Sequence, residues 1–311
     1  MYVFDTLAPV FLFVILGALL RSTSFLPRDF FLGCNKLVFY LGLPAFLFSK
    51  IVSTDFDISS SAKIFYVLVI TMVLSIGFAY ITAFITKVPR SSYSAFVQVA
   101  FRGNTALVGI PVIVYALSGT ADESMVNIAI VALAPAIPIW NVVSLLLLVA
   151  HGEKKNKLFS LNITRRIVSN PLVIACVAGL VVAGIDLELP KFIVVSCSKL
   201  GQMTLPLALI SIGASLSLSR LKGKISIAIV ASLVKIIICP ALGFLCCYLL
   251  DMSDVETFIA LIYCASPTAV SAYVMTEQMG GDEDVAGSGI VLSTLFASIP
   301  LIVIVAVYGI V

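Results

Sequence analysis

The chain has 311 residues, of which 61% are hydrophobic and 11% are charged, with a formal net charge of +3. A soluble domain carries about a quarter charged residues, so this composition excludes an ordinary soluble protein and predicts a chain embedded in a lipid bilayer. The small net charge gives no reason to expect a nucleic-acid partner. The seven cysteines show no metal-ligand spacing, and the single histidine, His151, stands alone in a charged loop. We therefore expect no metal site, no cofactor and no enzymatic activity.

Apolar stretches long enough to cross a membrane follow one another along the whole chain. Helices are the expected form, because the bilayer core offers backbone groups no partner outside the segment itself. The sequence therefore predicts an all-α membrane protein of ten transmembrane helices, which cover residues 4–21, 30–51, 62–86, 93–117, 124–150, 167–185, 191–217, 225–250, 256–278 and 285–309.

The loops between these stretches alternate in charge. Acidic loops contain Asp55, Asp122, Asp186 and Asp251, whereas the basic ones contain Arg21, Lys87, Lys154 and Lys224 with their neighbours. Basic loops face the cytoplasm. We therefore predict a membrane protein with both termini outside and a basic cytoplasmic linker at 153–166. The acidic loop around Asp282 departs from the pattern, because it should face the cytoplasm.

The two halves of the chain repeat their proline and glycine positions at an offset of about 162 residues. Five spans in each half force the second half to enter the membrane from the opposite side. The repeat is therefore expected to be inverted, with halves at 1–152 and 167–311, an architecture common in secondary transporters. The matching positions include Pro9 with Pro171, Gly17 with Gly179, Pro44 with Pro206, Gly119 with Gly281, and Pro138 with Pro300.

The fourth and ninth spans are interrupted at equivalent places, in "AFRGNTALVGIPV" and in "CASPTAVSAYVMTEQMGG". A proline kink with local hydrogen bonds would explain one break, but paired breaks indicate a binding site near the membrane midplane. Half-helix N-termini that face a cavity carry partial positive charge and suit an anion. The residues predicted to bind substrate at these breaks are Arg102, Asn104, Thr105, Ser266, Pro267 and Thr268.

Over essentially its whole length the sequence resembles the bacterial branch of the auxin efflux carrier family. The resemblance lies in "RGNTALVGIP", "ASPTAVSAYVMTEQMGG", "NKLVFYLGLPAFLF" and "LVKIIICPALG". It implies a ten-helix inverted repeat in which helices four and nine cross as unwound segments, as in sodium/bile acid symporters and sodium/proton antiporters. By the same analogy, spans one, two, six and seven form a scaffold against which the rest moves. The resemblance to the bacterial branch also implies that the protein lies in a bacterial inner membrane.

The resemblance also bears on the substrate. Plant members of the family export auxin, and bacterial members are linked to malonate, malate and related organic acids. Plant members carry Asn-Pro-Asn at the first break. The matching stretch here is Gly103-Asn104-Thr105, so only the asparagine carries over directly.

Two cations fall inside the predicted spans near the breaks. Lys235 lies near the middle of the eighth span, where a buried lysine needs a cavity or a partner. We predict that it either pairs with a substrate carboxylate or tethers carbonyl groups of a broken helix. Arg102 either lines the cavity or caps the first half of its helix. Carboxylates are scarce at this depth, which disfavours a cation antiporter and favours an anion carrier.

The leading hypothesis is a secondary active transporter of small organic carboxylates, such as malate, malonate or auxin-like acids, that works by alternating access. One alternative is a sodium-coupled symporter of larger amphipathic acids, with oxygen ligands from the two breaks and from Gln98, Ser266 and Thr268. Another is a membrane sensor that does not transport. A coupled proton or sodium ion, the lipid bilayer and a second copy of the chain are the partners that this interpretation allows.

Overall fold

A computed structural model describes residues 2–23, 25–53, 58–117, 124–151, 169, 171–185, 187–215, 221, 223–278 and 280–308. The predicted linker at 153–166 lies outside these residues, as do several of the charged loop residues used for the topology. The described secondary structure is helical throughout, apart from one isolated β-bridge. An all-α protein is therefore confirmed.

The helices of the first half of the chain include two that contain a π-helical turn. They are α1 (Tyr2–Ser22), the continuous run α2 (Arg28–Leu37), η1 (Val38–Gly42) and α3 (Leu43–Val52), α4 (Ile58–Ile85), the short η2 (Arg90–Ser92), α5 (Tyr93–Phe101), η3 (Thr105–Gly109), α6 (Ile110–Leu117) and α7 (Ser124–His151).

The second half contains α9 (Pro171–Gly184), α10 (Lys191–Ser215), the continuous run α11 (Ile225–Leu233), η5 (Val234–Ile238) and α12 (Cys239–Leu249), α13 (Asp254–Ala265), α14 (Val270–Gln278), α15 (Glu283–Phe296) and α16 (Ser298–Tyr308). Several helix starts differ by two to four residues from the expected spans, and α13, which begins at Asp254 and not at residue 256, is one of them. Ser253 and Glu256 cap this helix reciprocally and fix its first turn at Asp254.

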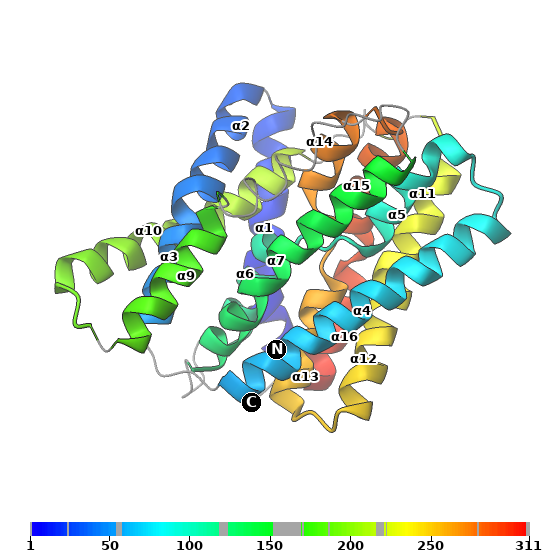
Figure 1. Cartoon of the computed structure of the whole chain (residues 1–311). Helices are drawn as coiled ribbons and strands as arrows, with labels where there is room; N and C mark the ends of the chain where they lie inside the picture. The colour runs from blue at the N-terminus through cyan, green and yellow to red at the C-terminus, as the bar shows by residue number, and fades with distance from the viewer. Residues whose placement is uncertain are drawn as a thin grey trace.

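Two groups of helices lie side by side (Figure 1). Bundle A consists of α1, α2, η1, α3, α9 and α10, which pack mainly on one another. Bundle B consists of α4 to α7 and α11 to α16. They meet where α6 lies against α1, where α7 lies against α3 and α9, and where η3 lies against α10. Bundle A thus contains the helices of the first, second, sixth and seventh predicted spans.

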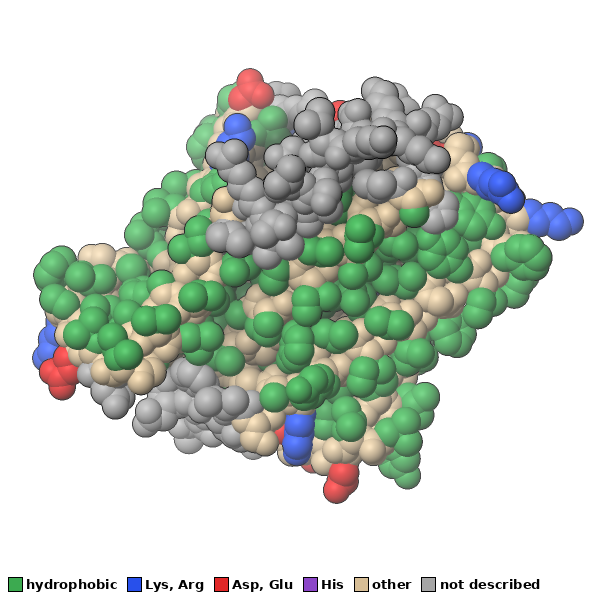
Figure 2. Space-filling model, viewed as in Figure 1, with side chains coloured by type: hydrophobic (Ala, Val, Ile, Leu, Met, Phe, Trp, Pro, Cys, Tyr) green, Lys and Arg blue, Asp and Glu red, His purple; other side chains and the backbone are tan. Residues whose placement is uncertain are grey.

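Six helical runs are long and apolar enough to cross a membrane, and Figure 2 shows apolar side chains across the middle of the visible face with charged groups at its edges. The described structure therefore supports a multi-pass membrane protein. Shorter apolar helices occupy the first, fourth and sixth predicted spans, and the broken pair α13 and α14 occupies the ninth, so the count of ten crossings stays a prediction. The six runs are Asp29–Val52, Ser59–Ile85, Met125–Leu148, Lys191–Ala214, Ile225–Leu249 and Glu283–Tyr308.

Two glycines hold α1 and α10 close together in bundle A. A methyl group at Gly17 would overlap the backbone carbonyl of Ile210, and one at Gly213 would overlap that of Val14. Small residues at a helix crossing let the two backbones approach, which is a main source of helix association in lipid. These two positions therefore fix the geometry of bundle A.

We expect Gly213→Ala to destabilise the protein by about 1 to 3 kcal/mol, because the added methyl group forces the two backbones apart. The sign of this change in stability is informative, because alanine in a helix is otherwise more stable than glycine by about 1 kcal/mol. Gly77→Ala in α4 is the matched control, because its new methyl group would meet nothing within 4 Å. Thermal unfolding in detergent measures the midpoints of both variants. Equal midpoints for Gly213→Ala and Gly77→Ala would contradict the prediction.

A charged cluster explains the acidic loop that departs from the charge pattern. Asp282 accepts hydrogen bonds from Nζ of Lys224 at 2.8 Å and from Oγ of Ser92 at 2.5 Å. Its other carboxylate oxygen accepts from the backbone N–H of Val285 and caps α15. The carboxylate is therefore neutralised by a basic residue on the same side of the molecule.

This cluster predicts a pH dependence of stability. Burial by itself raises the pKa of Asp282, but hydrogen bonds from Lys224 and Ser92 outweigh it and hold the pKa below its usual value. The ionised Asp282 therefore contributes to the free energy of unfolding at pH values above its unfolded-state pKa of about 4. This contribution is lost as pH falls through the lower folded-state pKa. We expect Asp282→Asn to lose about 0.5 to 1 kcal/mol at neutral pH, since Lys224 is partly exposed. Melting curves recorded at several pH values should show the deficit shrinking in acid, and a deficit that is independent of pH would contradict the prediction.

Candidate functional site

The two broken helices cross through a short stretch of extended chain. Between α5 and η3, and between α13 and α14, the backbone leaves the helix, and Gly103 pairs with Thr268 in an antiparallel bridge. The backbone N–H of Asn104 donates to the carbonyl of Pro267 at 2.6 Å, and that of Ala269 donates to the carbonyl of Arg102 at 3.0 Å. Backbone groups freed by each break are thus satisfied by the other break, as the bilayer requires.

The local sequence explains why both helices stop here. Proline disfavours helical backbone in the residue before it, and Ser266 accordingly has φ −55° and ψ 136°. On the other chain segment, Gly109 leaves room for the crossing, because a Cβ there would lie 2.8 Å from Cδ1 of Tyr263 and 2.9 Å from Oγ of Ser266. The glycines and the proline of the two motifs therefore permit the break and the close approach.

The hydroxyl groups of Ser266 and Thr268 form hydrogen bonds within the crossover itself. Oγ of Ser266 donates to the carbonyl of Ile262 at 2.9 Å. Oγ1 of Thr268 donates to the carbonyl of Val99 at 2.8 Å, and its backbone N–H donates to Oγ of Ser293 at 3.0 Å. In this conformation the two side chains, both fully buried, hold α13 and α14 in place.

Lys235 lies in the π-helical turn η5 and is 1% exposed. Its Nζ donates to the carbonyl of Cys264 at 2.8 Å, in the last turn of α13, and lies 3.5 Å from Sγ of Cys239. A cation at a helix C-terminus is favourable, because the helix dipole is negative there. The geometry is that of the tether to a broken helix, which was one of the two roles that the sequence left open.

A cavity of about 160 Å³ lies beside the crossover, where bundle A meets bundle B. Lys235 does not line it, but borders a much smaller space that shares Gly103 and Thr105 with it. The wall of the 160 Å³ cavity combines the first break, the start of α14, part of α7 and three residues of bundle A. The lining residues are Phe39, Leu43, Arg102, Gly103, Asn104, Thr105, Ala106, Leu107, Ile137, Trp140, Asn141, Leu172, Ala269, Val270 and Ser271.

Arg102 gives this cavity its charge. The side chain is 5% exposed, and its guanidinium contacts the thioether of Met275 and donates to the amide oxygen of Asn141. Among the described residues, no carboxylate lies within ion-pairing distance of it. A buried cation with neutral partners is costly, and an anion in the cavity would relieve that cost.

Two helix N-termini reach the same cavity. Thr105, Ala106 and Leu107 form the first turn of η3, while Val270 and Ser271 begin α14. The first-turn N–H groups of a helix have no partner within that helix and carry partial positive charge. The arrangement of a guanidinium and two helix N-termini around one cavity is suited to an anion.

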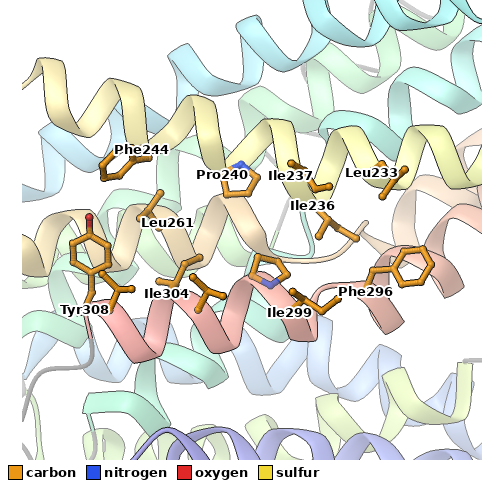
Figure 3. Close-up of a pocket in the computed structure, with 13 residues that line it drawn as sticks. Leu233, Ile236, Ile237, Pro240, Phe244, Leu261, Phe296, Ile299, Ile304 and Tyr308 are labelled. Carbon is orange, nitrogen blue, oxygen red and sulfur yellow. The ribbon is translucent and has the colours of Figure 1, made fainter.

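A larger groove of about 740 Å³ lies elsewhere, between α12 and α16 (Figure 3). Side chains from the two helices face each other across it, and all are apolar except for the hydroxyl group of Tyr308. Several lie largely exposed on the outer surface, such as Ile299 at 65% and Val307 at 68%. The groove therefore faces the lipid and offers an anion no partner.

The structure divides the predicted site residues into two sets. Arg102, Asn104 and Thr105 line the cavity, whereas Ser266, Pro267, Thr268 and Lys235 lie in the contacts of the crossover. Substrate contact by either set stays a prediction. Sequence reasoning did not find Asn141, Trp140 and Phe39. The position of this asparagine well inside the largely apolar fifth span was the available signal for Asn141.

The fold and the site define a multi-pass membrane protein with a polar, cationic cavity beside two crossed, broken helices. Residues 2–305 match the membrane transport protein family, and the chain belongs to that family. It is 24% identical to an uncharacterised transporter of Methanocaldococcus jannaschii, over 98% of this chain and 97% of that protein. It is 26% identical to a protein of Rhizobium meliloti named "Putative malonate transporter", over 93% of this chain and 90% of that protein. The chain is therefore a membrane transporter, and its relatives are not enzymes.

Proposed function

We propose that the chain is a secondary active transporter of small organic carboxylates, with the cavity beside the crossover as its substrate site. The observation that carries the proposal is the buried guanidinium of Arg102, which contacts only neutral groups among the described residues and shares the wall of that cavity with two helix N-termini. A carboxylate matches the fork of donors that an arginine presents.

The position of the cavity supports alternating access. The cavity wall draws on both bundles. Bundle A supplies Phe39, Leu43 and Leu172, whereas bundle B supplies Arg102 and Asn141. A displacement of bundle B against bundle A would carry the crossover and its bound anion from one membrane face to the other. The inverted repeat of ten spans, the outside termini and the bacterial inner membrane are parts of the same proposal.

The size of the cavity favours small acids. Liquid water takes about 30 Å³ per molecule, so roughly five waters or one acid of malonate size would fill 160 Å³. The relative named for malonate agrees with this size. A larger aromatic acid such as auxin would require the cavity to widen.

The purified chain in proteoliposomes tests the proposal. We expect uptake of radiolabelled malonate or malate, and stabilisation against heat by the same acids in detergent. Larger amphipathic acids such as cholate should have no effect. If small dicarboxylic and hydroxy acids neither stabilise the protein nor enter the vesicles, the proposal is wrong.

A sodium-coupled symporter is the second candidate, and one observation favours it. Gln98 is fully buried, and its Oε1 has no hydrogen-bond partner, as is true of Oγ of the neighbouring Ser144. Unsatisfied oxygens one helical turn from Arg102 could coordinate a cation. Replacement of sodium by choline should abolish uptake if this candidate holds, and should leave it unchanged for a carrier without sodium coupling.

A further inference from the structure

The proposed site raises the question of which charge state of an acid it accepts. Of the described residues that line the cavity, Arg102 is the one with an ionisable side chain. The other polar groups of the wall are the amides of Asn104 and Asn141 and the hydroxyl groups of Thr105 and Ser271. These neutral groups can donate to a carboxylate, and they can both donate to and accept from a neutral carboxylic acid, but none of them supplies a full positive charge.

The helix ends at the crossover do not add a second full charge. The N-termini of η3 and α14 contribute only partial charges of about half a unit each, and the negative end of α5 adjoins them at Arg102. Lys235 is engaged with the carbonyl of Cys264 and lies outside the cavity wall. Arg102 therefore provides the cavity with one net positive charge in direct contact.

The rest of the wall is apolar. Leu43 and Leu172 are 1% and 2% exposed, and Phe39, Ile137 and Trp140 complete this side of the cavity. A second ionised carboxylate would have to lie against these side chains without a cation. Burial of an unpaired charge in such surroundings is strongly unfavourable, whereas a neutral carboxyl group needs only hydrogen bonds.

We infer that the site selects singly charged acids, and that it takes a dicarboxylic acid as the hydrogen monoanion. Carboxylates and histidines are absent from the described residues that line the cavity, so none of these residues can carry a coupled proton. The proton instead travels on the second carboxyl group of the substrate. This inference rests on the proposed function and adds the charge state of the substrate and the carrier of the proton.

Three ligands of nearly equal size test the inference, namely malonate, monomethyl malonate and dimethyl malonate. The monomethyl ester is a monoanion that cannot lose a second proton, and the dimethyl ester is neutral. Equilibrium binding to the wild-type protein is measured from about pH 5 to 8, where the guanidinium stays charged. Affinity for malonate should fall about tenfold per pH unit above its second pKa, in parallel with the fraction of monoanion. Affinity for the monomethyl ester should stay constant, and the dimethyl ester should not bind.

The outcomes separate the inference from the proposal on which it rests. The inference is overturned, while the carboxylate site stands, if malonate binds with constant or rising affinity as pH increases. It is also overturned if the monomethyl ester binds more than tenfold more weakly than malonate at neutral pH. If no acid binds at any pH, both fail. Phe39→Lys adds a second cation to the wall, and it should flatten the pH profile for malonate.

Discussion

Arg102→Gln should lower the affinity for the transported acid more than a hundredfold, or about 2.7 kcal/mol, while the protein stays folded. The substitution removes the one charged group of the described cavity wall and leaves a side chain of similar reach. Loss of one partner of a buried, hydrogen-bonded charge pair costs about 2 to 5 kcal/mol of binding energy. Equilibrium binding of malonate measures the loss.

Stability distinguishes a binding role from a structural one. The guanidinium of Arg102 is buried against neutral groups, so the substrate-free protein carries the cost of an uncompensated charge. We therefore expect the thermal midpoint of Arg102→Gln to equal or exceed that of the wild type. Arg102→Lys should recover part of the affinity, because it restores the charge without the bidentate fork.

Arg90→Gln is the matched control, since it removes the same charge from an exposed residue at the end of bundle B. It should leave both affinity and stability unchanged. Wild-type affinity in Arg102→Gln would place the anion elsewhere, and a large loss of stability with unchanged affinity would make Arg102 a structural cap of α5.

Composition and motif order were enough to predict a helical membrane transporter, because the bilayer leaves few ways to satisfy a backbone. The proline and glycine positions also located both breaks, since these residues act locally on the backbone. The π-helical turns η1, η3 and η5 were not predicted. They depend on how neighbouring helices pack, and residues such as Leu37–Leu43 carry no local signal for the extra residue per turn.

Assignment of roles at the crossover was harder for the same reason. Ser266 and Thr268 have the composition of a binding site, but their hydroxyl groups bond to backbone carbonyls of α13 and α5. Conversely, Phe39 and Trp140 look like ordinary core residues in sequence, yet they line the cavity. Whether a side chain faces a cavity or the neighbouring helix depends on helix rotation, which the sequence of a span that is apolar on all sides does not encode.

Lys235 and Arg102 show how the same charge can take different roles within one crossover. Arg102 directly follows the C-terminal end of α5, and Lys235 faces the C-terminal end of α13. The ammonium of Lys235 bonds to a carbonyl of that end, whereas the guanidinium of Arg102 turns to an amide and a thioether. The first cation is compensated by the helix end, and the second is not.

We therefore expect Lys235→Met to act first on stability. The substitution keeps an unbranched side chain but leaves the carbonyl of Cys264 without its donor in a low-dielectric interior, which costs about 2 kcal/mol. For a chain of 311 residues that corresponds to a fall of about 3 °C in the thermal midpoint. Lys235→Arg should retain part of the stability, because it keeps a donor and a charge.

Lys199→Met in α10 provides the comparison, since it replaces an exposed lysine with the same residue and should leave the midpoint near that of the wild type. Affinity for the acid should fall less in Lys235→Met than in Arg102→Gln, because Lys235 lies outside the described cavity wall and adjoins it at Gly103, where an added Cβ would lie 3.3 Å from Nζ. If Lys235→Met instead abolishes binding without loss of stability, Lys235 is the counter-ion of the substrate. The crossover must then open in the substrate-bound state far enough to free Nζ from Cys264.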